Sequence, residues 1–221
     1  MFVGHYGVSF LARKADDSIP LWVLFLAVQL LDVVWAPLVL LGVEKVRIVP
    51  GFTATNAVDL YYYPYTHSLV AAVAWAAAAA IAYRLWTGFS RRPGGGSRAA
   101  AIVGIAVFSH WVLDFVVHRP DLPLYDDTAK VGLGLWDRPL LAFGLEAALL
   151  LLGLRLYLAR RPGRGVGLVV FGLVMLAIQA MVFFGPPPES GALIAATALA
   201  SYVVFAIVVW WLADRRPAGS S

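Results

Sequence analysis

Long runs of apolar residues recur along the whole chain and are separated by short breaks rich in proline, glycine or arginine. A bilayer core about 30 Å thick is crossed by about 20 such residues in helical form. Six segments approach or reach that length: 21–43, 68–85, 99–117, 140–158, 166–184 and 192–212. Only 14% of the 221 residues are charged, so no separate soluble domain is expected. The sequence predicts an all-α, polytopic membrane helical bundle, with residues 1–221 in one domain.

Basic residues mark four places along the chain, and in a six-span protein all four lie on one side of the membrane. They are Arg13/Lys14, Arg91/Arg92/Arg98, Arg160/Arg161/Arg164 and Arg215/Arg216. The positive-inside rule therefore predicts a multi-pass protein of a bacterial-type inner membrane with both termini in the cytoplasm. Because the net charge of +4 comes from these short loops, it does not indicate a nucleic-acid partner. Segments 44–67 and 118–138 carry most of the carboxylates and are expected on the outer side.

Residues 1–14 are apolar but would cover only about 20 Å as a helix, too little to cross the bilayer. We expect a short N-terminal helix that is re-entrant or interfacial. If Arg13 and Lys14 mark its cytoplasmic boundary, His5 lies about 13 Å deep at a rise of about 1.5 Å per residue. The same count places four groups of other helices at about 16 to 22 Å: Asp32, His110, Asp114 and Glu146. Groups at matching depth are expected to meet.

The most informative local pattern is at residues 109–118, which read Ser-His-Trp-Val-Leu-Asp-Phe-Val-Val-His. Steps of four residues place His110, Asp114 and His118 on one face of a helix. Three ionisable groups on one face of a membrane helix are costly without a partner, which favours a ligand role over packing. We interpret this face as half of a metal site.

The chain has no cysteine, so metal ligands must be nitrogen and oxygen atoms. The predicted ligands are His5, Asp32, His67, His110 and Asp114, enough for one or two divalent ions. Imidazole and carboxylate favour zinc, and manganese would also fit, whereas calcium and magnesium prefer oxygen alone. For Asp32 taken singly, a hydrogen bond between helices is an equally good interpretation. Glu146 is more often a packing residue than a ligand.

Four sequence motifs together resemble a known family over about the first 125 residues. They are Gly4-His5, Leu31-Asp32, Tyr65-Thr66-His67-Ser68-Leu69, and Ser109-His110 through Asp114. They resemble the inner-membrane metal-dependent hydrolases, the LexA-regulated hydrolase-like family. Their order is also similar to the ligand order of zinc-dependent phospholipase C and P1-type nucleases. The resemblance implies the same five metal ligands, while the absence of a second His-x-x-x-Glu pair argues against a three-ion centre.

These observations predict a membrane-embedded, metal-dependent hydrolase that acts on an ester, with a lipid phosphoester as the expected substrate. A metal ion generates hydroxide from water without a serine or cysteine nucleophile. Arg119 could hold an anionic head group, and His118 or Asp121 could act as acid or base. Residues 1–125 would form the metal-site half and residues 139–213 the supporting helices. Membrane lipids are the expected partners, and the site is expected to face the outer side.

Two other classes of function fit the same residues. Intramembrane carboxylates and histidines could form the pathway of a proton- or ion-coupled transporter. Against this, the chain shows no evident repeat and no paired helices broken by glycine or proline. A closed metal site could also stabilise a non-catalytic scaffold. The sequence leaves this choice and the oligomeric state open.

Overall fold

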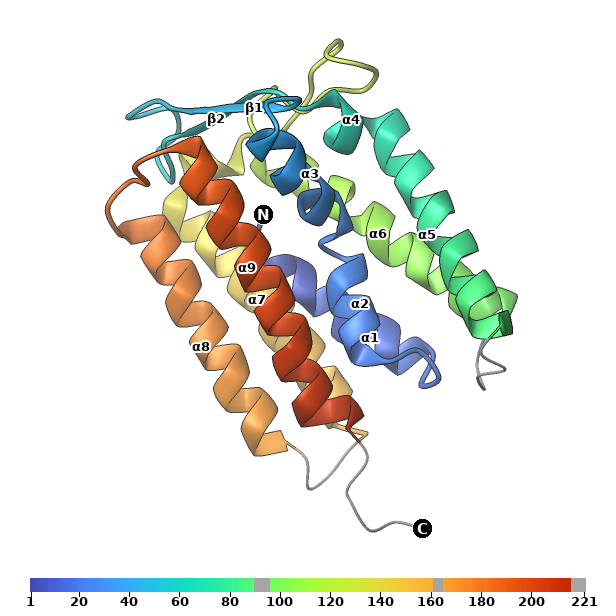
Figure 1. Cartoon of the computed structure of the whole chain (residues 1–221). Coiled ribbons are helices and arrows are strands. Elements are labelled where there is room, and N and C mark those ends of the chain that lie inside the picture. Colours follow the sequence, from blue (N-terminus) through green and yellow to red (C-terminus); the bar gives the residue numbers. More distant parts are fainter. Residues whose placement is uncertain (90–95, 161–164, 216–221) are drawn as a thin grey trace, which may run out of the picture.

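The computed structural model describes residues 1–89, 96–160 and 165–215 of the chain. The elements are α1 (Gly4–Ala15), α2 (Leu21–Ala27), α3 (Leu30–Leu40), β1 (Lys45–Ile48), β2 (Val58–Tyr62), α4 (Pro64–His67), α5 (Leu69–Phe89), α6 (Ser97–Val117), η1 (Leu135–Asp137), α7 (Pro139–Leu158), α8 (Gly165–Phe184), α9 (Gly191–Val209) and η2 (Trp210–Asp214). Within these ranges five helices are long and apolar enough to cross a membrane, or six if α2 and α3 count as one bent span. The predicted all-α bundle is confirmed (Figure 1).

The first predicted span, 21–43, is wrong as a single helix. It is broken at Val28 and Gln29 into α2 and α3, whose axes differ by 53°. Pro37 lies inside α3 and does not cause the break. Two tertiary contacts accompany the break. The side-chain amide of Gln29 donates to the Phe2 carbonyl oxygen at 3.1 Å, and the Val28 carbonyl oxygen lies 2.8 Å from His110 Nδ1. The other five predicted spans agree with α5 to α9 to within a few residues.

The predicted short N-terminal helix is α1, and the N-terminus lies among the helices of the bundle (Figure 1). Its first turn would leave backbone N–H groups without partners in an apolar interior. Glu146 of α7 accepts two of them, from Phe2 at 2.9 Å and Gly4 at 3.2 Å. A carboxylate there also favourably opposes the positive end of the helix dipole. Glu146 therefore anchors the N-terminal end of α1.

Helices α1 and α7 approach closely because glycine occupies both sides of their contact. A Cβ atom on Gly153 of α7 would collide with the Gly7 carbonyl oxygen of α1. We expect Gly153→Ala to lower the free energy of unfolding by about 1–3 kcal/mol, because the added methyl group forces the backbones apart. Gly144→Ala in the same helix is the control, since a Cβ there meets no atom within 4 Å. Thermal unfolding in detergent measures both variants, and equal melting temperatures would contradict the prediction.

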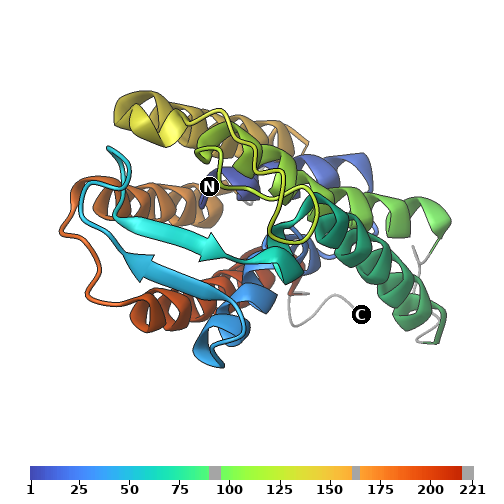
Figure 2. The ribbon, with the colours of Figure 1, turned by 90° about the horizontal axis from the view of Figure 1, so that it is seen from above.

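A two-stranded antiparallel hairpin, β1 with β2, lies across one end of the bundle (Figure 2). The sequence predicts an outer loop for this segment and no strands. The alternation of charged and apolar residues in Lys45-Val46-Arg47-Ile48 is the signal that could have found β1. Arg47 Nε pairs with Asp59 Oδ2 across the strands at 2.6 Å. We call this side of the molecule the hairpin end.

The described basic residues of the topology prediction lie at the ends of α1, α7 and η2 and near the start of α6. Figure 1 shows these helix ends on the side of the bundle away from the hairpin. Arg98 Nη2 donates to the Ala15 carbonyl oxygen at 3.1 Å, and Arg160 Nη1 to the Lys14 carbonyl oxygen at 3.4 Å. These contacts join the ends of α1, α6 and α7. The remaining members of the predicted set fall outside the described residues: Arg91, Arg92, Arg161, Arg164 and Arg216. The bundle of long apolar helices thus has basic residues at one end and the hairpin at the other.

Candidate metal centre

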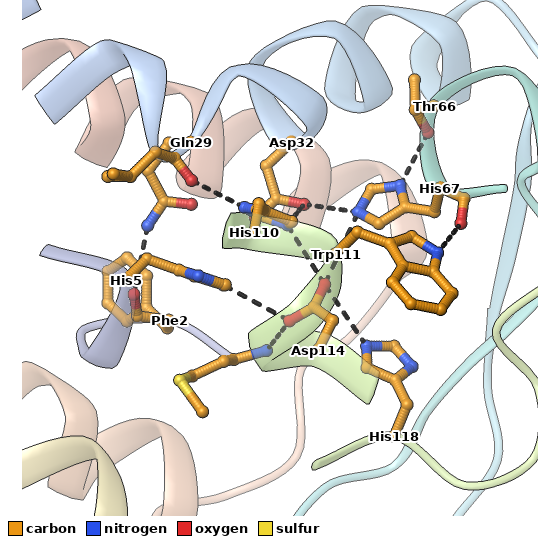
Figure 3. A network of polar contacts seen from close by, with 12 residues as sticks. Phe2, His5, Gln29, Asp32, Thr66, His67, His110, Trp111, Asp114 and His118 are labelled. Atoms are coloured by element: carbon orange, nitrogen blue, oxygen red, sulfur yellow. Dashed lines mark hydrogen bonds and ion pairs between the residues drawn. The ribbon is translucent and has the colours of Figure 1, made fainter. Parts of the chain in front are cut away.

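All four histidines of the chain point their Nε2 atoms at one carboxylate, that of Asp114 (Figure 3). The Nε2 atoms of His110 and His5 lie 3.1 and 3.3 Å from its oxygens, and those of His67 and His118 both lie 3.8 Å away. All five residues are at most 2% exposed. The amino nitrogen of Met1 also contacts Asp114 Oδ1, at 2.5 Å.

Four separate segments bring these side chains together. Helix α6 supplies His110 and Asp114 on one face, as their spacing predicted, and α1 supplies His5 beside them. His67 is the last residue of α4. The placement of His118 within the same helix is wrong, because α6 ends one residue earlier and His118 is extended, with ψ of 147°. Its imidazole nevertheless returns toward Asp114 from the hairpin end.

Asp32 completes the predicted ligand set from α3. Its Oδ1 lies 3.3 Å from His67 Nε2 and 3.7 Å from His110 Nε2, while its Oδ2 accepts a hydrogen bond from Tyr202 of α9 at 2.6 Å. Two trios with ligand atoms within 4.8 Å of one another result, and they share His110: His5, His110 and Asp114, and Asp32, His67 and His110. The five predicted ligands therefore lie in one cluster, and we refer to them as the five-residue cluster.

The break between α2 and α3 fixes the tautomer of His110. The Val28 carbonyl oxygen, 2.8 Å from His110 Nδ1, can only accept a hydrogen bond, so Nδ1 carries the proton. The Nε2 atom then presents a lone pair toward the two carboxylates. A backbone carbonyl in this position is the usual outer support of a metal-binding histidine.

A hydrogen-bond relay from His67 through Thr66 to Glu44 fixes the tautomer of His67 in the same way. The Thr66 hydroxyl donates to Glu44 Oε2 at 2.7 Å, and His67 Nδ1 lies 2.7 Å from the same hydroxyl oxygen. Because the hydroxyl proton is already directed to Glu44, Thr66 accepts from His67 Nδ1–H. Burial raises the pKa of Glu44, and the hydrogen bonds that it accepts from Thr66 and Tyr65 oppose this rise. His67 Nε2 is left free to bind a cation.

The three predicted catalytic residues do not lie together. His118 Nδ1 lies 3.0 Å from Asp121 Oδ1, whose carboxylate also accepts from the Tyr63 hydroxyl at 3.3 Å, so this histidine too directs Nε2 inward. Arg119 is exposed and turns away. Its guanidinium lies 5.0 Å from the ring centre of Phe52 and donates to the Phe52 carbonyl oxygen. The structure brings His118 and Asp121, but not Arg119, to the cluster.

The cluster could hold a metal ion. Neutral imidazoles whose Nδ1 atoms are protonated turn lone pairs toward carboxylate oxygens, and both nitrogens of His5 and Nε2 of His110 have no hydrogen-bond partner among the described residues. Four protonated imidazoles and the Met1 ammonium would leave a net charge of about +3 against the two carboxylates in a buried site, which is costly. One divalent ion with neutral imidazoles and the Met1 ammonium would leave a smaller net charge of about +1. The donor set fits a first-row metal such as zinc.

A cavity of about 160 Å³ adjoins the cluster. Its polar lining includes Asp32, His67, Asp114 and His118, so these groups border on open space. A structural zinc site is closed by its ligands, whereas a catalytic one keeps a position for water or substrate. The cavity therefore favours an open site.

Several residues that support the centre are not predicted from the sequence. Tyr63, Thr66 and Tyr202 each contact a cluster residue or the pair of His118 and Asp121, and Glu44 reaches His67 through Thr66. Thr66 stands beside His67 in the chain, which is a usable signal. The other three come from distant segments and carry no local signal.

Comparison of the chain with family models, with curated proteins and with solved structures returns no match. The resemblance to the inner-membrane metal-dependent hydrolases stays a prediction.

Proposed function

We propose that this protein is a membrane-embedded, metal-dependent hydrolase that cleaves an ester, with a lipid phosphoester as the expected substrate. The observation that carries the proposal is the cavity beside the five-residue cluster, because a ligand set that borders on open space can admit water and substrate. Zinc is the expected metal and manganese also suits the donors. The basic loops of the protein lead us to expect the hairpin end on the outer side of an inner membrane.

When bound, a divalent ion would polarise the ester oxygen and lower the pKa of a water molecule. His5, Asp32, His67, His110 and Asp114 would hold it. His118 lines the cavity and is backed by Asp121 at Nδ1, so its Nε2 can accept the proton of the attacking water and return it to the leaving alcohol. The water oxygen bonds to the phosphorus or acyl carbon, and the bond to the leaving oxygen breaks.

The test combines metal analysis and hydrolysis on detergent-purified protein. Elemental mass spectrometry should find near-stoichiometric zinc or manganese. The loaded protein should cleave bis(4-nitrophenyl) phosphate or 4-nitrophenyl acetate, and a chelator should abolish the cleavage until metal is restored. Absence of bound metal, even after supplementation, would overturn the proposal and favour the ion-coupled transporter. Bound metal without cleavage of a soluble or lipid ester would favour the non-catalytic scaffold.

A further inference from the structure

The cavity beside the centre has two chemically different sides. Cluster residues and His118 form the polar side, whereas Val182 of α8 and Ile194 and Ala198 of α9 form part of the other. These three side chains belong to the two most apolar of the candidate membrane spans. A cavity that joins metal ligands to membrane-helix side chains is suited to a molecule with a polar and an apolar part.

The packing of the helices makes this apolar side accessible from the membrane. Helix α8 packs mainly on α7, and α9 packs mainly on α2 and α3, so neither is the principal partner of the other. Val182 is 54% exposed on the surface that a membrane would cover. The cavity therefore borders on the lateral surface between α8 and α9.

The hairpin covers the same cavity at its end of the bundle. Asn56, Val58 and Leu60 from the hairpin, together with Trp136, contribute to the lining. Figure 2 shows the strands lying across the ends of the helices. The Thr55 hydroxyl donates to the Trp136 carbonyl oxygen, which fastens the hairpin to the segment before α7. Entry past the hairpin would break this contact, whereas lateral entry leaves it intact.

The size of the cavity limits what can enter. Its volume of about 160 Å³ is below the roughly 300–1,000 Å³ of pockets that enclose drug-sized ligands. It can take a small head group with its ester linkage but cannot take acyl chains. Chains attached to that head group would have to remain outside, against α8 and α9.

Building on the proposed function, we propose that the substrate is a membrane amphiphile that enters sideways between α8 and α9 at the hairpin end. Its head-group ester occupies the cavity beside Asp114, and its acyl chains stay in the lipid against Val182, Ile194 and Ala198. Ala198 controls entry because its small side chain leaves room for the linkage between head group and chains.

The test uses Ala198→Phe, with Ala196→Phe as the matched control, since Ala196 lies on the same helix, is exposed and is not part of the lining. Full-length protein, with metal and after chelation, is placed in phosphatidylglycerol vesicles carrying a diazirine on one acyl chain. After photolysis, mass spectrometry maps the labelled residues. We expect label at Val182, Ile194 or Ala198 in both wild-type samples. Ala198→Phe should reduce the labelling of Val182 and Ile194 about tenfold, a change in occupancy equivalent to about 1.4 kcal/mol. Ala196→Phe should not reduce it.

A second measurement separates this inference from the proposed function. Ala198→Phe should retain its metal while losing cleavage of the vesicle lipid, whereas Ala196→Phe should retain both the metal and the lipid cleavage. Equal lipid cleavage in the two variants with metal retained, or unchanged lipid labelling, would overturn lateral entry. Wild-type label confined to other lipid-facing residues would also overturn it, whether or not Ala198→Phe folds. Lipid labelling of the cavity without cleavage of any ester would support lateral entry and contradict the hydrolase proposal.

Discussion

Asp114→Asn should yield a folded protein without bound metal and with ester cleavage at background. Asp114 is the carboxylate shared by all four imidazoles, and asparagine preserves its shape while removing the charge that a divalent ion needs. Loss of an outer-shell partner alone typically lowers metal affinity about 10–100-fold, so loss of this central ligand should exceed that range. Elemental mass spectrometry and the turnover of bis(4-nitrophenyl) phosphate measure the two effects.

Glu189→Gln is the control for Asp114→Asn, because it removes one carboxylate charge at an exposed position between α8 and α9. It should keep both metal and turnover. His110→Ala should reproduce the loss seen in Asp114→Asn, since His110 belongs to both ligand trios. Full metal occupancy in Asp114→Asn, with normal elution from a sizing column, would show that the cluster is not the metal centre.

Thr66→Val should weaken metal binding about 10–100-fold while leaving all five ligands in place. Valine has nearly the shape of threonine but cannot accept from His67 Nδ1 or donate to Glu44. The imidazole then loses the partner that fixes its tautomer. Titration of the metal-free protein against a competing chelator measures the change in affinity.

Two further variants separate this positioning role from general stability. Thr66→Ser restores a hydroxyl and should recover most of the affinity. Thr87→Val removes a hydroxyl that is equally buried but donates to the Tyr83 carbonyl oxygen of its own helix, α5. It should leave metal affinity unchanged. Equal affinities in Thr66→Val and Thr87→Val would show that the relay does not support the centre.

Helical spacing and depth carried much of the prediction of the site. The four-residue step in α6 placed His110 and Asp114 on one face, and the count from Arg13 brought His5 to the level of both. Both rules depend on helix geometry alone, which apolar membrane spans obey closely. The same count placed Glu146 at that level, where it binds the start of α1 and makes no hydrogen bond to a cluster side chain in the described residues.

The parts that sequence could not supply depend on contacts between distant segments. Ala27-Val28-Gln29-Leu30 contains no proline or glycine, so the break between α2 and α3 has no local signal. It becomes understandable only once His110 is seen to bind the Val28 carbonyl oxygen and the Gln29 side chain is seen to bind the Phe2 carbonyl oxygen. Glu44 joins the relay for the same reason, since the chain turns back after α3 and brings it beside Thr66.

The docking of α1 on α7 has a consequence for how the protein is made. Gly4 and Glu146, which meet at the start of α1, are 142 residues apart in the chain. At about 5–20 residues per second, a ribosome needs roughly 7–28 s to synthesise that interval. His110 and Asp114 of α6 are therefore synthesised before Glu146 of α7, which anchors the helix that carries His5. We expect a chain truncated before α7 to contain all five cluster residues but to leave α1, and with it His5, without this anchor.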